Sequence, residues 1–281
     1  MEASLYSSNI ANIVLNAILC FFAITLNGAT IYALGKTPSL PKPLKALLLS
    51  LAFSHLGVGI LSHPLFITRL ALESRLQADL HTSFPTFYRV YSFVTGQFAY
   101  ASFFGVLFLS LDRFLAIHLH LRYQELVTYQ RVVTAVISAW VLSGLIPLIW
   151  RQIPIHIAYV LLAILVVSCF VVSGVLNSMI YATVRRHAHQ IHSLQVQPTV
   201  QENAPNVTNA STLRRSTFMT IHIYGFISFY PGLAVLKAVY QYTFTLVLLN
   251  SSLNPLIYCW KLRGVRQTIM TTLINALSSQ N

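Results

Sequence analysis

The sequence has few charged residues, and acidic ones are the scarcest. Of its 281 residues 9% are charged, with six Asp and Glu against 18 Lys and Arg, while 56% are hydrophobic. The mean hydropathy is +0.66. So few charges cannot cover the surface of a soluble globular protein, in which about a quarter of residues are charged. The long apolar runs instead predict membrane-spanning helices of about 20 residues each.

Cysteine is also scarce. Cys20, Cys169 and Cys259 all lie in or at the edge of apolar segments, and no two of them have the spacing of a metal site or a disulfide. We therefore predict no disulfide, no metal site and no cofactor. The N-terminus lacks a positively charged stretch followed by a small-residue cleavage site, so we expect no cleaved signal peptide. The first span is then expected to direct membrane insertion.

The basic residues lie between apolar runs. A net charge of +12 could indicate a nucleic-acid partner, but such a partner requires a basic face with stacking aromatics, and the sequence has none. Most of the Lys and Arg fall in loops that would share one side of a membrane. The positive-inside rule places that side in the cytoplasm, so the N-terminus is expected outside and the C-terminus inside the cell.

Hydropathy predicts seven spans in a single domain, 1–281. We expect an all-α membrane protein, a seven-transmembrane helix bundle with a short C-terminal amphipathic helix at about 261–276. The predicted spans are 9–34, 46–68, 87–115, 130–150, 154–184, 214–235 and 238–260. An odd number of spans agrees with termini on opposite sides of the bilayer.

Ionisable and polar residues inside the spans are the first functional candidates. No charged residue occurs between Gln97 and Leu111, and then Asp112, Arg113 and Phe114 follow. Charges at a membrane edge are costly and indicate function, although ordinary flanking charges remain an alternative. Asn27 stands in an apolar part of the first span and must find hydrogen-bond partners on other helices.

The strings SLDRFLAIHLHLRYQELVT and LLNSSLNPLIYCWK resemble the third and seventh helices of rhodopsin-like G-protein-coupled receptors. Other residues that resemble this family stand in the right order on the predicted spans: Asn27, Trp140, Tyr181 and Pro231. The resemblance covers about residues 20–270. Tyr88 stands where the family usually has a disulfide cysteine, and the second outer loop is short. In loop pattern the chain is nearest to the melanocortin, adenosine and lipid-receptor branch or to an invertebrate chemosensory relative.

The resemblance implies roles for individual residues. Those of G-protein coupling and the activation switch are Asp112, Arg113, Phe114, Tyr181, Phe229, Pro231, Asn254, Pro255 and Tyr258. Those of a polar core are Asn27, His55, Ser102, Asn250 and Ser251. His55 replaces the Asp that helps hold a sodium ion in the family, and a neutral imidazole lacks the fixed negative charge that sodium requires. We therefore expect no sodium dependence.

A ligand pocket is expected toward the outer side, with Arg69, Glu73 and Lys237 at its mouth. Its predicted lining is Thr95, Gly96, Ala99, Tyr100, Phe229, Tyr230 and Phe244. Thr95 stands where amine receptors carry an Asp, which argues against biogenic amines. An apolar and aromatic lining favours a small, apolar or weakly polar ligand; a peptide or a nucleoside stays open.

The resemblance implies a receptor in the plasma membrane, not an enzyme, that binds an extracellular small molecule and activates a heterotrimeric G protein. An odorant receptor of the same fold is an alternative, and a small transporter is another. A transporter would be expected to carry inverted repeats or midplane carboxylates, and the sequence has neither. The ligand, the G-protein subtype and the oligomeric state stay open, as does the reason for the short stretch between Pro231 and Asn254.

Overall fold

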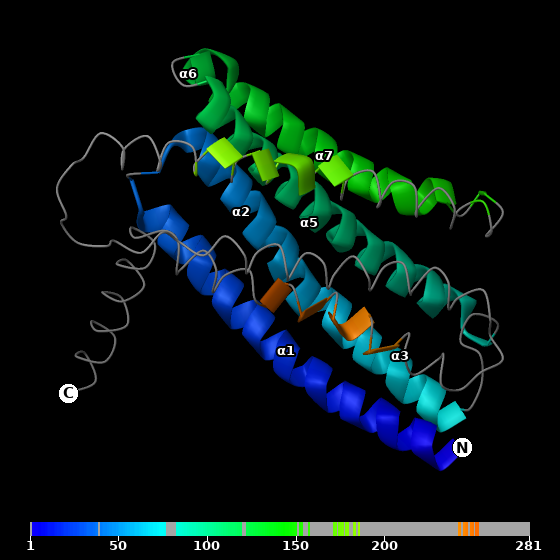
Figure 1. The fold of residues 1–281 in the computed structure, drawn as a ribbon. Coiled ribbons are helices and arrows are strands. Elements are labelled where there is room, and N and C mark those ends of the chain that lie inside the picture. The colour runs from blue at the N-terminus through cyan, green and yellow to red at the C-terminus, as the bar shows by residue number, and fades with distance from the viewer. Residues whose placement is uncertain are drawn as a thin grey trace, which may run out of the picture.

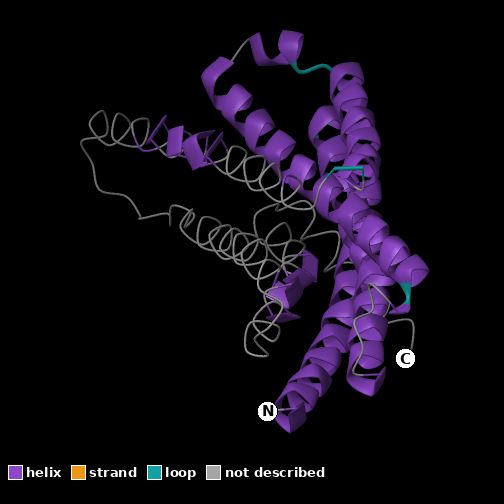
Figure 2. Cartoon of the chain, turned by 90° about the vertical axis from the view of Figure 1, so that its right-hand side faces the viewer, coloured by secondary structure: helices purple, strands orange, loops and turns teal. Residues whose placement is uncertain are grey.

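The structure is a computed structural model in which every regular element described is a helix (Figure 2). It describes residues 2–38, 40–76, 83–119, 122–150, 152, 153, 157, 171, 172, 174–176, 178, 179, 182, 183, 185, 241, 242, 244–246, 248, 249, 251 and 252. The described positions from 241 to 252 are all helical, and we refer to them as segment 241–252. They lie within the last predicted span.

Four helical spans in the described residues are long and apolar enough to cross a membrane: Tyr6–Lys36, Lys42–Leu76, Pro85–Leu119 and Tyr129–Ile149. The elements are α1 (Glu2–Lys36), α2 (Lys42–Gly57), the π-helix η1 (Val58–Ser62), α3 (His63–Leu76), α5 (Pro85–Leu119), the short α6 (Tyr123–Leu126) and α7 (Tyr129–Trp150). The chain is therefore a multi-pass helical membrane protein. These four spans correspond to the first four of the predicted seven.

The observed helices extend beyond the apolar runs that predicted them. The second span was predicted to end at 68, whereas α3 continues to Leu76. Its outer part includes Arg69 and Glu73, one turn apart, which form an ion pair of 3.0 Å between Nε and Oε1. Such an i,i+4 pair stabilises helix where hydrophobic periodicity gives no signal. Hydropathy thus detects the part of a helix that suits hydrocarbon and not the polar turns that continue it.

Proline and lysine define the junction between α1 and α2. Pro38 follows the end of α1, a common position because proline cannot continue a helix. Pro43 stands in the first turn of α2, where a missing backbone N–H costs no hydrogen bond. Lys45 Nζ donates to the carbonyl oxygen of Gly35 at 3.3 Å, which provides a partner for an end carbonyl of α1.

The spans pack side by side (Figure 1). α1 lies along α2, η1 and α3, and α5 packs between α2 and α7. Segment 241–252, the orange residues of Figure 1, makes hydrogen bonds to both α1 and α3. The first span, the second span and segment 241–252 therefore surround a common interior.

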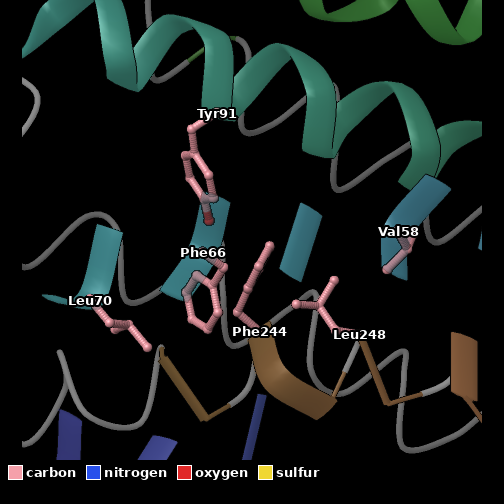
Figure 3. Packing of buried hydrophobic residues seen from close by; sticks show 6 residues of the cluster. All are labelled: Val58, Phe66, Leu70, Tyr91, Phe244 and Leu248. Atoms are coloured by element: carbon pink, nitrogen blue, oxygen red, sulfur yellow. The ribbon is translucent and has the colours of Figure 1, made fainter. Parts of the chain in front are cut away.

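The main hydrophobic core lies in this interior. It consists of Val58, Phe66, Leu70, Tyr91, Phe244 and Leu248, which come from η1, α3, α5 and segment 241–252 (Figure 3). The rings of Phe66 and Phe244 are in contact, with centroids 4.6 Å apart. Aromatic pairs of this kind add about 0.5–1.5 kcal/mol beyond the area that they bury. The core fixes segment 241–252 against the second and third spans.

The contact between α1 and η1 is especially close at Gly59. A Cβ atom added there would lie 2.9 Å from Ile24 Cγ1 and 3.2 Å from the backbone nitrogen of Ile24. The thiol of Cys20 donates to the carbonyl oxygen of Gly59 at 3.2 Å. Cys20 is the one cysteine among the described residues and is not in a disulfide. Only a residue without a side chain fits between the two backbones.

Candidate functional site

The acidic and basic residues near the C-terminal end of α5 form an ion pair. Arg113 Nη2 lies 2.9 Å from Asp112 Oδ2, and the Asp112 side chain is 3% exposed whereas that of Arg113 is 46% exposed. The aromatic ring of Phe114 stacks on His118 one turn later, with centroids 4.5 Å apart. The pair thus combines a buried carboxylate with a guanidinium that a partner can reach.

Tyr123 of α6 completes this inner group. Its hydroxyl donates to Asp112 Oδ1 at 2.6 Å, so the carboxylate is held by Tyr123 on one oxygen and by Arg113 on the other. Burial, followed by the hydrogen bond to Asp112, raises the pKa of Tyr123 to about 12. The phenol therefore keeps its proton at physiological pH and acts as the donor. The sequence prediction did not include Tyr123, although it stands within the string that resembles the family.

A second polar group lies between α1, α2, α5 and segment 241–252. His55 is fully buried, and its Nδ1 lies 3.0 Å from Ser251 Oγ and 3.4 Å from Ser102 Oγ. Asn27 is also fully buried, and its carboxamide donates to the backbone oxygen of Ser251 at 2.9 Å and to that of Ala23 at 2.8 Å. Four residues proposed for the polar core are thereby brought together. None of the four is acidic.

The residues expected to line the ligand pocket do not share one face of α5. Thr95 is buried, and its Oγ1 has no partner among the described residues. Gly96 lies against α7, because a Cβ there would be 3.0 Å from Pro147 Cγ. Ala99 is exposed, and Tyr100 is partly buried. Of the predicted lining, Phe244 belongs to the aromatic core and Thr95 stands one turn from Tyr91 of that core.

An outer polar network joins α1, α3 and segment 241–252, and the sequence prediction missed most of it. Asn16 Nδ2 donates to Asn12 Oδ1 and to Thr245 Oγ1, both at 2.8 Å, and Thr245 donates to Asn12 Oδ1 at 2.6 Å. His63 Nδ1 lies 3.1 Å from Asn16 Oδ1. Asn12, Asn16 and His63 are all 0% exposed. The three elements therefore meet through side-chain hydrogen bonds as well as through apolar contact.

Farther out, the network ends in the Arg69 and Glu73 pair. Gln241 Nε2 donates to Glu73 Oε2 at 3.3 Å, and Arg69 Nη1 lies 3.4 Å from the hydroxyl of Tyr91. The guanidinium also lies over the ring of Tyr91, 5.3 Å from its centroid. Each charge of the pair is thus matched by the other. The sequence placed Arg69 and Glu73 at the mouth of a pocket but not Gln241.

One signal could have revealed the network. Asn9, Asn12, Asn16 and Asn27 recur at helical spacing on the first span, and all four are buried on one face of α1. Of these four asparagines, the sequence prediction includes only Asn27, which also matches the family pattern. Buried carboxamides at such spacing predict a polar contact with another helix. The remaining candidates, Tyr181, Phe229, Tyr230, Pro231, Asn250, Asn254, Pro255 and Tyr258, lie outside the described residues.

The fold and these buried polar layers define a multi-pass helical membrane protein. Residues 26–153 match the profile of the family described as 7 transmembrane receptor (rhodopsin family). The match covers a little less than half of the chain, and it confirms the resemblance found in the sequence. The members of the family are receptors and not enzymes, in agreement with the prediction.

The curated relatives that match include adenosine receptors. The chain is 33% identical over 144 residues to adenosine receptor A2b of Gallus gallus, which covers 50% of this chain and 40% of that protein. It is 29% identical to adenosine receptor A2b of Bos taurus, over 50% of this chain and 41% of that protein. It is 25% identical to adenosine receptor A2a of Canis lupus familiaris, over 89% of this chain and 69% of that protein. The match thus spans about two fifths of the length of the first two relatives.

Proposed function

We propose that this protein is a G-protein-coupled receptor that binds a small extracellular ligand and activates a heterotrimeric G protein. The observation that carries the proposal is the arrangement of Tyr123, Asp112 and Arg113. A buried carboxylate holds an exposed guanidinium at the inner end of a span, in a chain of the rhodopsin family. An intramembrane charge pair of this kind is expected to be functional.

The switch works through two states of Arg113. In the resting state Arg113 is paired with Asp112, and in the active state it is released toward Tyr181 and the G protein as the sixth span moves outward. Phe114, Phe229, Pro231, Asn254, Pro255 and Tyr258 complete the proposed switch. Because Tyr123 holds the other oxygen of Asp112, it stabilises the resting state.

The proposed ligand is small and uncharged, and adenosine is the first candidate. The relatives that match carry adenosine in their names. In the outer part of the described bundle Arg69 and Glu73 are paired with each other, which disfavours a strongly charged ligand. The aromatic core beside Thr95 suits a flat ring. We retain Thr95, Gly96, Ala99, Tyr100, Phe229, Tyr230 and Phe244 as proposed lining residues.

The proposed topology is seven spans in the plasma membrane, with the N-terminus outside, the C-terminus in the cytoplasm and an amphipathic helix at 261–276. The four described spans and the helical segment 241–252 support this topology. The position of the polar core also supports it, since Asn27 and His55 both bond to Ser251, as the first, second and seventh spans of such a bundle would.

Second-messenger measurement in cells that express the full chain tests the function. Adenosine should change cyclic AMP or calcium in these cells and not in cells that express Arg113→Ala at the same surface level. A response that persists at normal strength in Arg113→Ala would overturn the receptor mechanism. Lack of any response to adenosine in the wild type would overturn only the choice of ligand, and a wider panel of neutral small molecules would then follow.

A further inference from the structure

The hydrogen bonds of Asn16 determine which nitrogen of His63 carries its proton. Asn16 Nδ2 lies 2.9 Å from the backbone oxygen of Asn12, which can only accept, so this atom is the amide nitrogen and Oδ1 faces His63. A carboxamide oxygen is an acceptor. His63 Nδ1 must therefore carry the proton and donate it to Asn16. In a neutral imidazole the other nitrogen, Nε2, is then an acceptor.

This acceptor is buried and has no partner in the part of the chain that the structure describes. His63 is 0% exposed, and its Nε2 bonds to nothing among the described residues. The hydroxyl of the neighbouring Ser62 and the amide nitrogen of Asn12 are also buried and have no hydrogen-bond partner among the described residues. A buried polar atom without a partner is costly, so three of them on neighbouring residues of this network call for an explanation. A bound molecule that supplies the missing partners is such an explanation.

The local backbone turns these groups inward. Ser62 is the last residue of the π-helix η1 and His63 is the first of α3, and both are 0% exposed although they are adjacent in the chain. A π-helical turn inserts one extra residue into a helix and occurs often at functional sites.

The surroundings of the imidazole define what could bind there. Phe66, one turn after His63, packs on Phe244, the neighbour of Thr245, so the polar network borders the aromatic core. The next charged residues along α3, Arg69 and Glu73, form an ion pair with each other. The site therefore suits an uncharged molecule with an apolar ring and a hydrogen-bond donor.

We propose that His63 is a ligand-binding residue whose Nε2 accepts a hydrogen bond from a hydroxyl or N–H group of a small, neutral, ring-containing ligand. The ligand lies between α1, α3 and segment 241–252, with its ring against Phe66 and Phe244, and Asn12 and Ser62 supply further hydrogen bonds. This proposal rests on the receptor function proposed above and extends the ligand site to the first and second spans. Because His63 is 0% exposed, this proposed site must open for the ligand to enter.

Two substitutions separate ligand binding from a structural role. The amide nitrogen of Asn can take the place of His Nδ1, so His63→Asn keeps the donor to Asn16 and loses the acceptor at Nε2. His63→Gln keeps an acceptor in place of Nε2 and loses the donor to Asn16. Adenosine is the probe, and the full-length protein in nanodiscs is measured for adenosine affinity and for thermal stability without ligand.

The proposal predicts opposite effects of the two changes. His63→Asn should weaken adenosine binding by about tenfold or more, as expected for the loss of one partner of a buried hydrogen bond, and leave the melting temperature near that of the wild type. His63→Gln should lower the melting temperature and keep adenosine affinity within about threefold. If His63→Asn binds adenosine as the wild type does, His63 has a structural role only and the proposal is overturned.

A second experiment does not depend on the identity of the ligand. A charged, membrane-impermeant methanethiosulfonate is applied to intact cells that express His63→Cys, and Ser54→Cys, which is equally buried, serves as the control. The wild type, with its own cysteines, gives the background. Labelling of His63→Cys above that background, without labelling of Ser54→Cys, is expected because the site opens to the outside. Absence of labelling overturns the proposal. If His63→Cys is labelled but the wild type does not bind adenosine, the site stands and the choice of adenosine falls.

Discussion

The hydroxyl of Tyr123 donates a 2.6 Å hydrogen bond to the carboxylate of Asp112, from a short helix to the end of a membrane span. Asp112 thus has one oxygen held by Tyr123 and the other by Arg113. This arrangement lets the loop after the third span influence the charge pair that is proposed to control signalling.

Tyr123→Phe removes that hydrogen bond and should raise basal signalling. A hydrogen bond to a charged group contributes about 1.5–3 kcal/mol, so its loss shifts a two-state equilibrium by about tenfold or more. Basal second-messenger level, normalised to surface expression, is the measurement. Tyr129→Phe, at an exposed position at the start of α7, should leave the level unchanged. Equal basal activity in both variants would contradict a role of Tyr123 in the resting state.

The same hydrogen bond predicts how the inner group responds to pH. The pKa of Tyr123 is raised from 10.0 to about 12, first by burial, so the neutral phenol is favoured in the folded state. Its contribution is therefore fully present below pH 10.0 and is lost only as pH rises through about 12. Ultraviolet titration of the purified protein should contain a late-ionising tyrosine that is absent in Tyr123→Phe. Identical titration curves would show that the phenol is free.

Gly59→Ala should destabilise the protein because the new methyl group would lie 2.9 Å from Ile24 Cγ1 and 3.2 Å from the Ile24 nitrogen. Overpacking of this kind typically costs about 1–3 kcal/mol. Gly28→Ala is the matched control, since no atom lies within 4 Å of an added Cβ there. The melting temperature in nanodiscs should fall for Gly59→Ala and not for Gly28→Ala. A similar melting temperature for both would show that the contact between α1 and η1 can relax.

Sodium should have no effect on basal signalling in the wild type, because His55 supplies no fixed negative charge and its neighbours Ser102 and Ser251 are neutral. His55→Asp supplies a carboxylate and should introduce a sodium response, measured as basal activity at varied sodium and constant ionic strength. His55→Asn, which adds no charge, is the control. Marked sodium sensitivity of the wild type would contradict this prediction, since it would show that the protein binds sodium without a carboxylate at position 55.

The orientation predicts that two sequons, at Asn206 and Asn209, stay unmodified in the cytoplasm. A C-terminal tag should be protected from protease added to intact cells, whereas an N-terminal tag should be cleaved. Treatment with a glycosidase should not change the electrophoretic mobility of the protein. A glycan on either asparagine would reverse the proposed topology.

The sequence predicted the helical class correctly, because the length and period of its apolar runs indicate membrane-spanning helices. The cost of a polar group in lipid also drew attention to Asn27, whereas His55 was included through the family resemblance; both are buried. The sequence did not predict that Gly96 of α5 lies against α7, where a Cβ would be 3.0 Å from Pro147 Cγ, because this contact depends on how two helices pack. Tyr123 and His63 were missed for a related reason: their partners, Asp112 and Asn16, are on other elements, and spacing along one helix does not reveal its neighbours.

The row of asparagines on α1 has a consequence for biosynthesis. The ribosome makes the first helix long before residues 241–252, yet Asn16 and Asn27 find their hydrogen-bond partners on Thr245 and Ser251. During most of translation these carboxamides therefore stand in the membrane without their final partners. Since an orphan polar group in hydrocarbon is costly, the nascent first helix should stay close to the insertion machinery until the last span emerges. A chain that is cut short before residue 241 would then carry an unfinished helix that quality control can recognise.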